Sequence, residues 1–266
     1  DGDLMEGISH ESCAFAGHLN LNKLIVLYDD NGITIDGETS LSFSEDVEGR
    51  FKSYGWNVDQ VDGHDMAAVE TAIQAAQDSD KPTLIRCRTT IGYGAPTKSG
   101  SASSHGAPLG ADDIKGARES YGWSHPPFEI PKDILDQWRH IGQRGKPAFS
   151  EWTERYTGAV IDKKKAFDSA LNKDFDDQVH REIRQLKKAF AEDRPKIATR
   201  AASGQVLDKI VPEIADLIGG SADLSGSNKT QPKGVEIIDR DNFKGQYIHY
   251  GVREHGMAAA MNGMAL

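Results

Sequence analysis

Cysteine is scarce in this sequence, which holds two, Cys13 and Cys87, in 266 residues. Two thiols make neither a disulfide framework nor a cysteine-based metal site, so small disulfide-stapled folds and zinc-binding modules are excluded. Both lie in apolar segments, which predicts buried side chains that fill space. Low cysteine usage is typical of a reducing compartment, and we expect a cytoplasmic protein.

Long apolar runs are also missing, and none of the runs present could span a bilayer. A net charge of −10 and a pI near 5.4 argue against nucleic acid or an anionic membrane surface as the main partner. Neither a Walker A motif nor Gly-x-Gly-x-x-Gly after a strand is present, which disfavours a generic nucleotide-binding domain.

An initiator methionine is absent as well, and Leu266 falls in the middle of an expected helix. We therefore expect the chain to be an internal fragment of a longer protein.

Strand-like and helix-like segments alternate along the first part of the chain. The continuous apolar run 23–28 is typical of a strand buried on both faces. Alternation of strands with helices predicts crossover units and an α/β fold with a parallel sheet. The expected strands are 23–28, 57–61 and 82–90, and the expected helices are 4–17, 43–54, 66–77 and 111–123.

The segment from Asp1 to Ile33 has the pattern of a site for a metal-bound diphosphate. Gly2 lets backbone approach phosphate closely, and the helix that follows offers free N–H groups. Asp1, Asn31 and Ile33 could supply a carboxylate, an amide oxygen and a backbone carbonyl, the hard oxygen ligands that Mg²⁺ prefers. Asn31 comes just after a strand, at the edge of an open sheet where ligands bind. The alternative is two unrelated turns, because Asp-Gly and Asn-Gly are common turn dipeptides.

Gly-Asp-Gly followed after such an interval by Asn is typical of thiamine diphosphate enzymes, and "DGDLMEGISHE" with "DDNGITIDG" resembles transketolase. The leading glycine of the family pattern is absent because the chain begins at Asp1. The resemblance implies the thiamine diphosphate-binding fold, with parallel sheets flanked by helices. It implies that Asp1, Gly2, Asn31 and Ile33 hold thiamine diphosphate, with Mg²⁺, or Ca²⁺ or Mn²⁺ in its place, on Asp1, Asn31 and Ile33. The acids that match Glu6 and Glu11 face the other subunit in this family.

A long loop rich in Gly, Ser and Pro runs from Thr89 to Gly110, and such loops are usually functional or disordered. A lone loop histidine is more often a surface residue than a catalyst. However, "SHGAPLG" is similar to the transketolase loop that carries an active-site histidine. The resemblance gives His105 a place beside the cofactor diphosphate and the substrate, where imidazole can donate to phosphate and shuttle protons.

Residues 131–195 are charged and helix-prone, with mixed-sign runs that predict a solvated helical face. We expect this segment to connect two domains and to pack on a surface, because its aromatic side chains need covering. These are Trp138, Phe149, Trp152, Tyr156, Phe167 and Phe190. The predicted boundaries are 1–130 for the diphosphate-binding domain, 131–195 for the helical connection and 196–266 for the start of a pyrimidine-binding domain.

Three stretches of the last segment resemble transketolase. Taken alone, "GGSADLSGSN" is a Gly/Ser turn that could bind an anion, and Arg-Glu at a helix start complements the helix dipole. The resemblance assigns Arg200 and Ser227 to the sugar phosphate, because the planar guanidinium suits phosphate. It places Asp223 near the thiamine. It also makes Glu254, within "HYGVREHGM", the glutamate that activates the cofactor.

The implied activity is transfer of a two-carbon ketol unit from a ketose phosphate to an aldose phosphate, as in the pentose phosphate pathway. The implied partners are xylulose 5-phosphate, ribose 5-phosphate and erythrose 4-phosphate, and a second copy of the chain. In the homodimer Asp1 and Asn31 would serve one cofactor, and Glu254 of the same chain the other. Two alternatives stay open, a dihydroxyacetone synthase-type transketolase that uses formaldehyde, and a non-catalytic truncated homologue.

Overall fold

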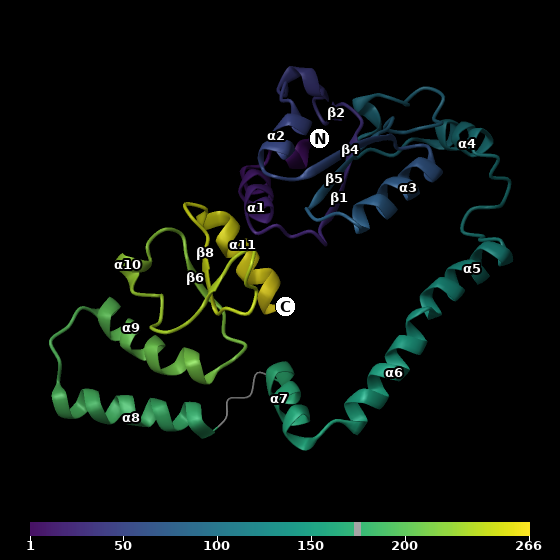
Figure 1. Ribbon diagram of the computed structural model, residues 1–266. Helices are drawn as coiled ribbons and strands as arrows, with labels where there is room; N and C mark the ends of the chain where they lie inside the picture. The colour runs from purple at the N-terminus through teal and green to yellow at the C-terminus, as the bar shows by residue number, and fades with distance from the viewer. Residues whose placement is uncertain (173–176) are drawn as a thin grey trace. The chain divides into compact units, whose positions relative to one another are not determined.

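The computed structural model describes residues 1–172 and 177–266 (Figure 1). The chain forms two compact units, of which the first contains Asp1–Trp123 and Ile218–Leu266 and the second contains Ser124–Leu217. The predicted helical connection includes 173–176, which lie outside the described residues.

A three-stranded parallel sheet organises the first part of the chain. Its strands are β1 (Ile25–Asp30), β5 (Thr83–Arg88) and β4 (Asn57–Asp62), in the order β1-β5-β4. Both pairings are parallel, and Asp30 and Asp62 both pair with Arg88 at the carboxyl ends of their strands. The predicted parallel sheet is confirmed, with β5 as its buried central strand.

Helices cover both faces of this sheet (Figure 1). α1 (Gly7–His18) and α2 (Val47–Ser53) pack on the face that carries Leu84, while α3 (Met66–Gln77) packs on the face that carries Ile85. Leu84 and Ile85 are both fully buried, because successive side chains of a strand point to opposite faces.

The two cysteines take part in this packing to different extents. Cys87 on β5 is buried, as predicted, whereas Cys13 on α1 is only partly buried. Burial raises the pKa of both thiols. The structure thus gives each thiol an environment that favours its neutral, unreactive form.

Several predicted boundaries move in the structure. β1 begins at Ile25 and continues to Asp30, beyond the apolar run at 23–28. α2 begins at Val47 and not at position 43, because the Asp46 side chain accepts a hydrogen bond from Gly49 N–H at 2.9 Å and caps the helix there. α4 ends at Ser120, three residues before the expected end at 123. The shorter elements of this region are η1 (Gly2–Met5), β2 (Ile33–Thr34), β3 (Gly37–Glu38), η2 (Thr39–Leu41), η3 (Ala102–Ser104) and α4 (Ala111–Ser120).

A second parallel sheet follows later in the chain, within the same compact unit. Its order is β6-β8-β7, formed by β6 (Gly219–Ser221), β8 (Tyr247–His249) and β7 (Ile237–Ile238). β6 is short and begins at Gly219. Helices α10 (Ser225–Asn228) and α11 (Glu254–Ala265) follow β6 and β8. The small core under this sheet contains Ile238, Ile248 and Tyr250, with Phe15, Met257 and Ala260 packed against it.

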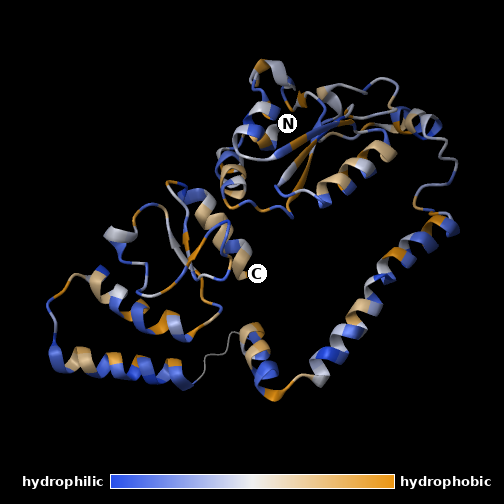
Figure 2. Cartoon of the chain, in the orientation of Figure 1, coloured by the Kyte–Doolittle hydropathy of each residue, from blue (hydrophilic) through white to orange (hydrophobic). Residues whose placement is uncertain are grey.

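The second unit is helical, as predicted for the connection. It contains α5 (Lys132–Gln143), α6 (Gly145–Gly158), α7 (Ile161–Asn172), α8 (Asp177–Asp193), α9 (Thr199–Ile210) and η4 (Val211–Glu213). Hydrophilic and hydrophobic residues intermix along α5 and α6 (Figure 2). None of the helices in the described residues combines the length and the apolar composition that a bilayer crossing needs.

The aromatic side chains of this unit are only partly covered. Trp152 on α6 stacks on Tyr156 at 5.3 Å, and Tyr156 lies 5.7 Å from Phe167 of α7. Trp138 and Phe149 are 68% and 65% exposed. The expectation that all of these rings are covered is therefore wrong for Trp138 and Phe149, and Trp152 and Phe167 also stay 39% and 40% exposed. The ring contacts between α6 and α7 involve Trp152, Tyr156 and Phe167, and Trp138 lies on α5.

Candidate functional site

Asp1 lies against the loop that follows β1. Its carboxylate accepts a hydrogen bond from Gly32 N–H at 2.8 Å and another from the Tyr28 hydroxyl. Gly32 has a φ of 73°, a left-handed conformation that glycine adopts without strain. The Asn31 side-chain oxygen accepts from Ile33 N–H at 3.0 Å, which closes the turn. The structure thus brings together the predicted ligands Asp1, Asn31 and Ile33, with Gly2 next to Asp1 in the chain.

Tyr28 connects this loop to the sheet. Burial, with the negative charge of Asp30 nearby as a smaller cause, raises the pKa of Tyr28 to about 12. The phenol is therefore neutral well above neutral pH, and its hydroxyl donates a hydrogen bond to the Asp1 carboxylate. A neutral donor holds the Asp1 carboxylate in place without cancelling its charge.

An ion-pair cluster lies under the same loop and was not predicted from the sequence. Asp30 is 4% exposed, and its two oxygens accept from Arg86 Nε at 2.6 Å and Arg88 Nη1 at 2.9 Å. Arg86 also pairs with Glu48 of α2 at 3.0 Å. Two arginines in a central strand were the available signal, because charges so placed must be paired. The cluster fixes the carboxyl end of β1 and hence the start of the Asn31 loop.

A pocket of about 660 Å³ opens at the carboxyl ends of β4 and β5. This edge of a parallel sheet is where ligands bind in open α/β folds. Among the predicted site residues, Asn31 contributes to it. Its lining is mostly polar and consists of Asn31, Gln60, Val61, Asp62, His64, Arg88, Thr89, Thr90 and Gly100.

His105 is exposed and follows the short helix η3. The loop that carries it is closed at its base, where Asp113 of α4 accepts from both the N–H and the hydroxyl of Thr97 at 2.7 Å. These hydrogen bonds lower the pKa of Asp113 below its usual value, and the bond from the Thr97 hydroxyl has the larger effect. Lys98 adds a second closure by donating to the Pro108 carbonyl at 2.8 Å. Both contacts join the stretch at Thr97 and Lys98 to the far end of the predicted functional loop, so they enclose the segment that contains His105.

Asp223 and Ser227 flank the start of α10, after β6. Asp223 has a φ of 60°, which is uncommon for a residue other than glycine. Behind it, the Ser221 hydroxyl accepts from Leu224 N–H at 3.1 Å and from the Asn228 amide at 3.1 Å. Both Asp223 and Ser227 have exposed side chains, so this turn presents them to solvent.

Glu254 is the first residue of α11, and its side chain is exposed. The helix end beside it is held by Glu11 of α1, whose carboxylate accepts from Gly256 N–H at 2.6 Å. Arg253 donates to the Tyr250 carbonyl at 2.9 Å. A carboxylate from another helix thus satisfies one of the free N–H groups of α11, a contact that no local sequence pattern signals.

Arg200 lies on α9 in the second unit and is exposed. The remaining predicted site residues belong to the first unit. The assignment of Arg200 to a substrate phosphate stays a prediction.

Two other features bear on the choice of site. Among the described residues no group of three or more His, Cys, Asp and Glu is placed to hold a metal. The predicted ligand set contains one carboxylate, one amide and one backbone carbonyl, so it is not a group of that kind.

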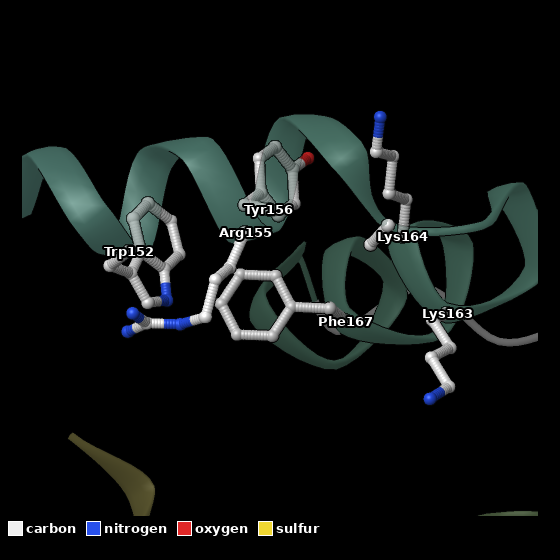
Figure 3. Close-up of a pocket in the computed structure, with 7 residues that line it drawn as sticks. Trp152, Arg155, Tyr156, Lys163, Lys164 and Phe167 are labelled. Carbon is white, nitrogen blue, oxygen red and sulfur yellow. The ribbon is translucent and has the colours of Figure 1, made fainter.

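A second pocket of about 220 Å³ lies between α6 and α7, where the rings of Trp152, Tyr156 and Phe167 gather (Figure 3). None of the predicted site residues lines it.

Comparison with known families matches both parts of the chain. The description "Transketolase, thiamine diphosphate binding domain" matches residues 1–182, and "Transketolase, pyrimidine binding domain" matches residues 195–266. Together these matches cover most of the chain, and they confirm the predicted fold class.

Individual relatives agree with this match. The chain is 48% identical over 266 residues to transketolase of Cereibacter sphaeroides and 46% identical to that of Rhodobacter capsulatus, covering 100% of this chain and 40% of each relative. Transketolase from Leishmania mexicana superposes with a TM-score of 0.88 at 34% identity, over 99% of this chain and 40% of that one. A Pichia stipitis transketolase complex with sedoheptulose 7-phosphate gives a TM-score of 0.87 at 38% identity, over 100% and 40%. The chain thus spans about 40% of the length of the curated relatives it matches.

Proposed function

The chain belongs to the transketolase family, and from this premise we propose that it serves the transfer of a two-carbon ketol unit from a ketose phosphate to an aldose phosphate. The observation that carries the proposal is the contact of Asp1 with the Asn31 loop, at 2.8 Å from Gly32 N–H. It lies within the segment that matches the thiamine diphosphate binding domain. The related Pichia stipitis structures are complexes with sedoheptulose 7-phosphate, fructose 6-phosphate and xylulose 5-phosphate, which supports sugar phosphates as the substrate class.

The loop residues fit a metal-bound diphosphate. Asp1 supplies a carboxylate, Asn31 an amide oxygen and Ile33 a backbone carbonyl, and all three are hard oxygen donors of the kind that Mg²⁺, Ca²⁺ and Mn²⁺ take. Since Gly32 N–H and the Tyr28 hydroxyl both donate to Asp1, its carboxylate is held beside the loop before any ligand arrives. Gly2 leaves room for phosphate, because apart from its two neighbours in the chain no residue has an atom within 4 Å of where its side chain would begin.

The other predicted residues are assigned to proton transfer and to binding of the cofactor and the substrate. Thiamine diphosphate, when bound, supplies a carbon nucleophile and an electron sink for carbon–carbon cleavage. Glu254 would hold and return a proton at the aminopyrimidine ring of the bound cofactor, and Asp223 would lie near the thiamine. His105 donates to phosphate and to the substrate. Arg200 and Ser227 bind the sugar phosphate, for which the planar guanidinium is suited.

We further propose that the active protein is a cytoplasmic homodimer with its sites at the subunit interface. Asp1 and Asn31 of one subunit would then serve the same cofactor as Glu254 of the other subunit. Acceptors of the ketol unit include ribose 5-phosphate and erythrose 4-phosphate. The family membership of both matched segments supports this arrangement.

The test is a ketol-transfer assay of the complete parent protein with thiamine diphosphate, Mg²⁺ and xylulose 5-phosphate, in which ribose 5-phosphate and formaldehyde compete as acceptors. Sedoheptulose 7-phosphate as the main product supports the proposal. Dihydroxyacetone as the main product would assign the protein to the formaldehyde-using enzymes. Cofactor binding without transfer to either acceptor would favour a non-catalytic homologue.

A further inference from the structure

His64 occupies a fixed place at the end of β4. The backbone N–H of His64 donates to the Asp62 carboxylate at 2.9 Å. The Asp65 carboxylate accepts from the backbone N–H groups of Ala67 and Ala68 at the start of α3. His64 therefore lies between a strand end and a capped helix, two rigid elements. It lines the pocket at the edge of the sheet and has no role in the proposed reaction.

Gly63 brings this turn against β5. Gly63 N–H donates to the Arg88 carbonyl at 2.8 Å. A Cβ at this position would lie 2.5 Å from the Thr89 side chain and 3.1 Å from the Arg88 carbonyl. Only glycine allows such an approach, and the result is that the ring of His64 reaches beyond Thr89.

The His64 ring then makes two contacts with the segment after β5. Its Nε2 accepts the N–H of Thr90 at 2.9 Å. Its face stacks on Tyr93 with 4.0 Å between ring centroids and 23° between planes. A backbone N–H can only donate, so the ring must present an unprotonated Nε2. The contact is therefore specific to a neutral imidazole or to another acceptor at the same place.

Tyr93 in turn contacts Tyr121, which directly follows α4. Its ring lies 6.1 Å from that of Tyr121, and the Tyr121 hydroxyl donates to the Tyr93 carbonyl. Gly94, with a φ of 79°, turns the chain beneath the Tyr121 ring, where a Cβ would lie 3.1 Å away. Three stacked rings thus connect the end of β4 to the end of α4 across the start of the loop.

The held segment lies against the residues that lead into His105. Gly100 N–H donates to the Ile91 carbonyl at 2.8 Å. A Cβ on Gly92 would lie 3.0 Å from the Ser104 side chain, so the two stretches are in close contact. Ser104 immediately precedes His105, so the position of residues 90–92 constrains the backbone position of His105.

We propose that His64 is a positioning residue, which accepts the Thr90 N–H and stacks on Tyr93 to hold the loop that carries His105. It acts through the loop and not on the substrate. The inference rests on the proposed function only for the role of His105, because the contacts themselves are independent of the reaction.

The test compares His64→Ala and His64→Gln in the full chain, with His140→Ala on the exposed face of α5 as the control. Amide hydrogen exchange at Thr90 is measured by NMR, together with the ring signals of His105. The glutamine side-chain oxygen can stand where Nε2 does, so it retains the acceptor without the ring. Unchanged exchange at Leu84 and Ile85 establishes that each variant keeps the sheet intact.

We expect His64→Ala to speed exchange at Thr90 about fivefold, the value of one net hydrogen bond, and to shift the His105 signals. His64→Gln restores slow exchange at Thr90 and moves the His105 signals back, and the control changes neither. Unchanged Thr90 exchange or unmoved His105 signals in His64→Ala would overturn the proposal, as would a glutamine variant that behaves like alanine. A complete parent protein that shows the expected pattern but transfers no ketol unit overturns the proposed function and leaves His64 in its positioning role.

Discussion

The carboxylate of Asp1 accepts the N–H of Gly32 at 2.8 Å, across 31 positions of sequence. The short helix η1, the helix α1 and the strand β1 lie between the two residues, so their contact depends on how the chain passes from α1 into β1. The contact turns two common turn dipeptides, Asp-Gly and Asn-Gly, into one group of oxygen donors. The local fold thereby assembles the proposed diphosphate site from residues that are distant in the chain.

Tyr28 should make the stability of the protein depend on pH in the alkaline range. Its pKa is raised from 10.0 to about 12, so the folded state holds the phenol proton more tightly than the unfolded chain does. The resulting stabilisation is complete below pH 10 and is lost as the pH rises toward 12. Urea unfolding of the wild type should therefore show a steeper fall in the free energy of unfolding over this range than Tyr28→Phe shows. Parallel curves for the two proteins would contradict this assignment.

Glu254→Ala should lower turnover about 10²- to 10⁴-fold, the usual value of a positioned proton-transfer group. Affinity for thiamine diphosphate in the presence of Mg²⁺ should stay near that of the wild type, because the metal and diphosphate ligands are far along the chain in Asp1 and the Asn31 loop. Steady-state kinetics and cofactor titration check the two parts separately. His255→Ala, at the next exposed position, is the matched control and should keep turnover. A wild-type rate in Glu254→Ala would remove this residue from the reaction.

Arg200→Ala should raise the KM for a ketose phosphate about tenfold to a hundredfold, the range for charged hydrogen bonds, while kcat changes little. Lys209→Ala, on the same helix α9, should leave both constants unchanged. An unphosphorylated ketose donor should not distinguish Arg200→Ala from the wild type. If it were affected as strongly as the phosphorylated donor, Arg200 would not be a phosphate ligand.

Much of the fold follows from local patterns. The apolar run before Asn31 and the apolar residues of 82–90 predicted strands of a parallel sheet, and the Ala-rich pattern at 66–77 predicted α3 with the bounds that the structure has. The spacing of Asp1 and Asn31, and the position of Asn31 just after a strand, predicted a group of oxygen donors, and the structure places both residues at one turn. Their role as ligands stays a prediction. In each case a single physical rule connects the sequence pattern to its place.

Other features depend on tertiary contacts. Phe43 is apolar, but Asp46 starts α2 later because its side chain caps Gly49, a signal present in the sequence and not used. The pairing of Asp30 with Arg86 and Arg88 and the contact of Glu11 with Gly256 join residues that no local spacing connects. His64 reaches Thr90 only because Gly63 passes close to β5, which the sequence alone does not reveal. The roles of all the predicted site residues remain predictions, those of Arg200, Asp223 and Ser227 among them.

The central claim is that Asp1 and the Asn31 loop hold a metal-bound diphosphate, and the most direct test is calorimetric titration of the chain with thiamine diphosphate. Wild type, Asp1→Ala and the control Asp3→Ala, an exposed acid two residues further on, are compared with limiting Mg²⁺ and with chelator. The account predicts Mg²⁺-dependent binding in the wild type and in Asp3→Ala, and a loss of about tenfold or more in Asp1→Ala, as expected when a charged ligand is removed. Equal affinity in Asp1→Ala and wild type at limiting Mg²⁺ would contradict it.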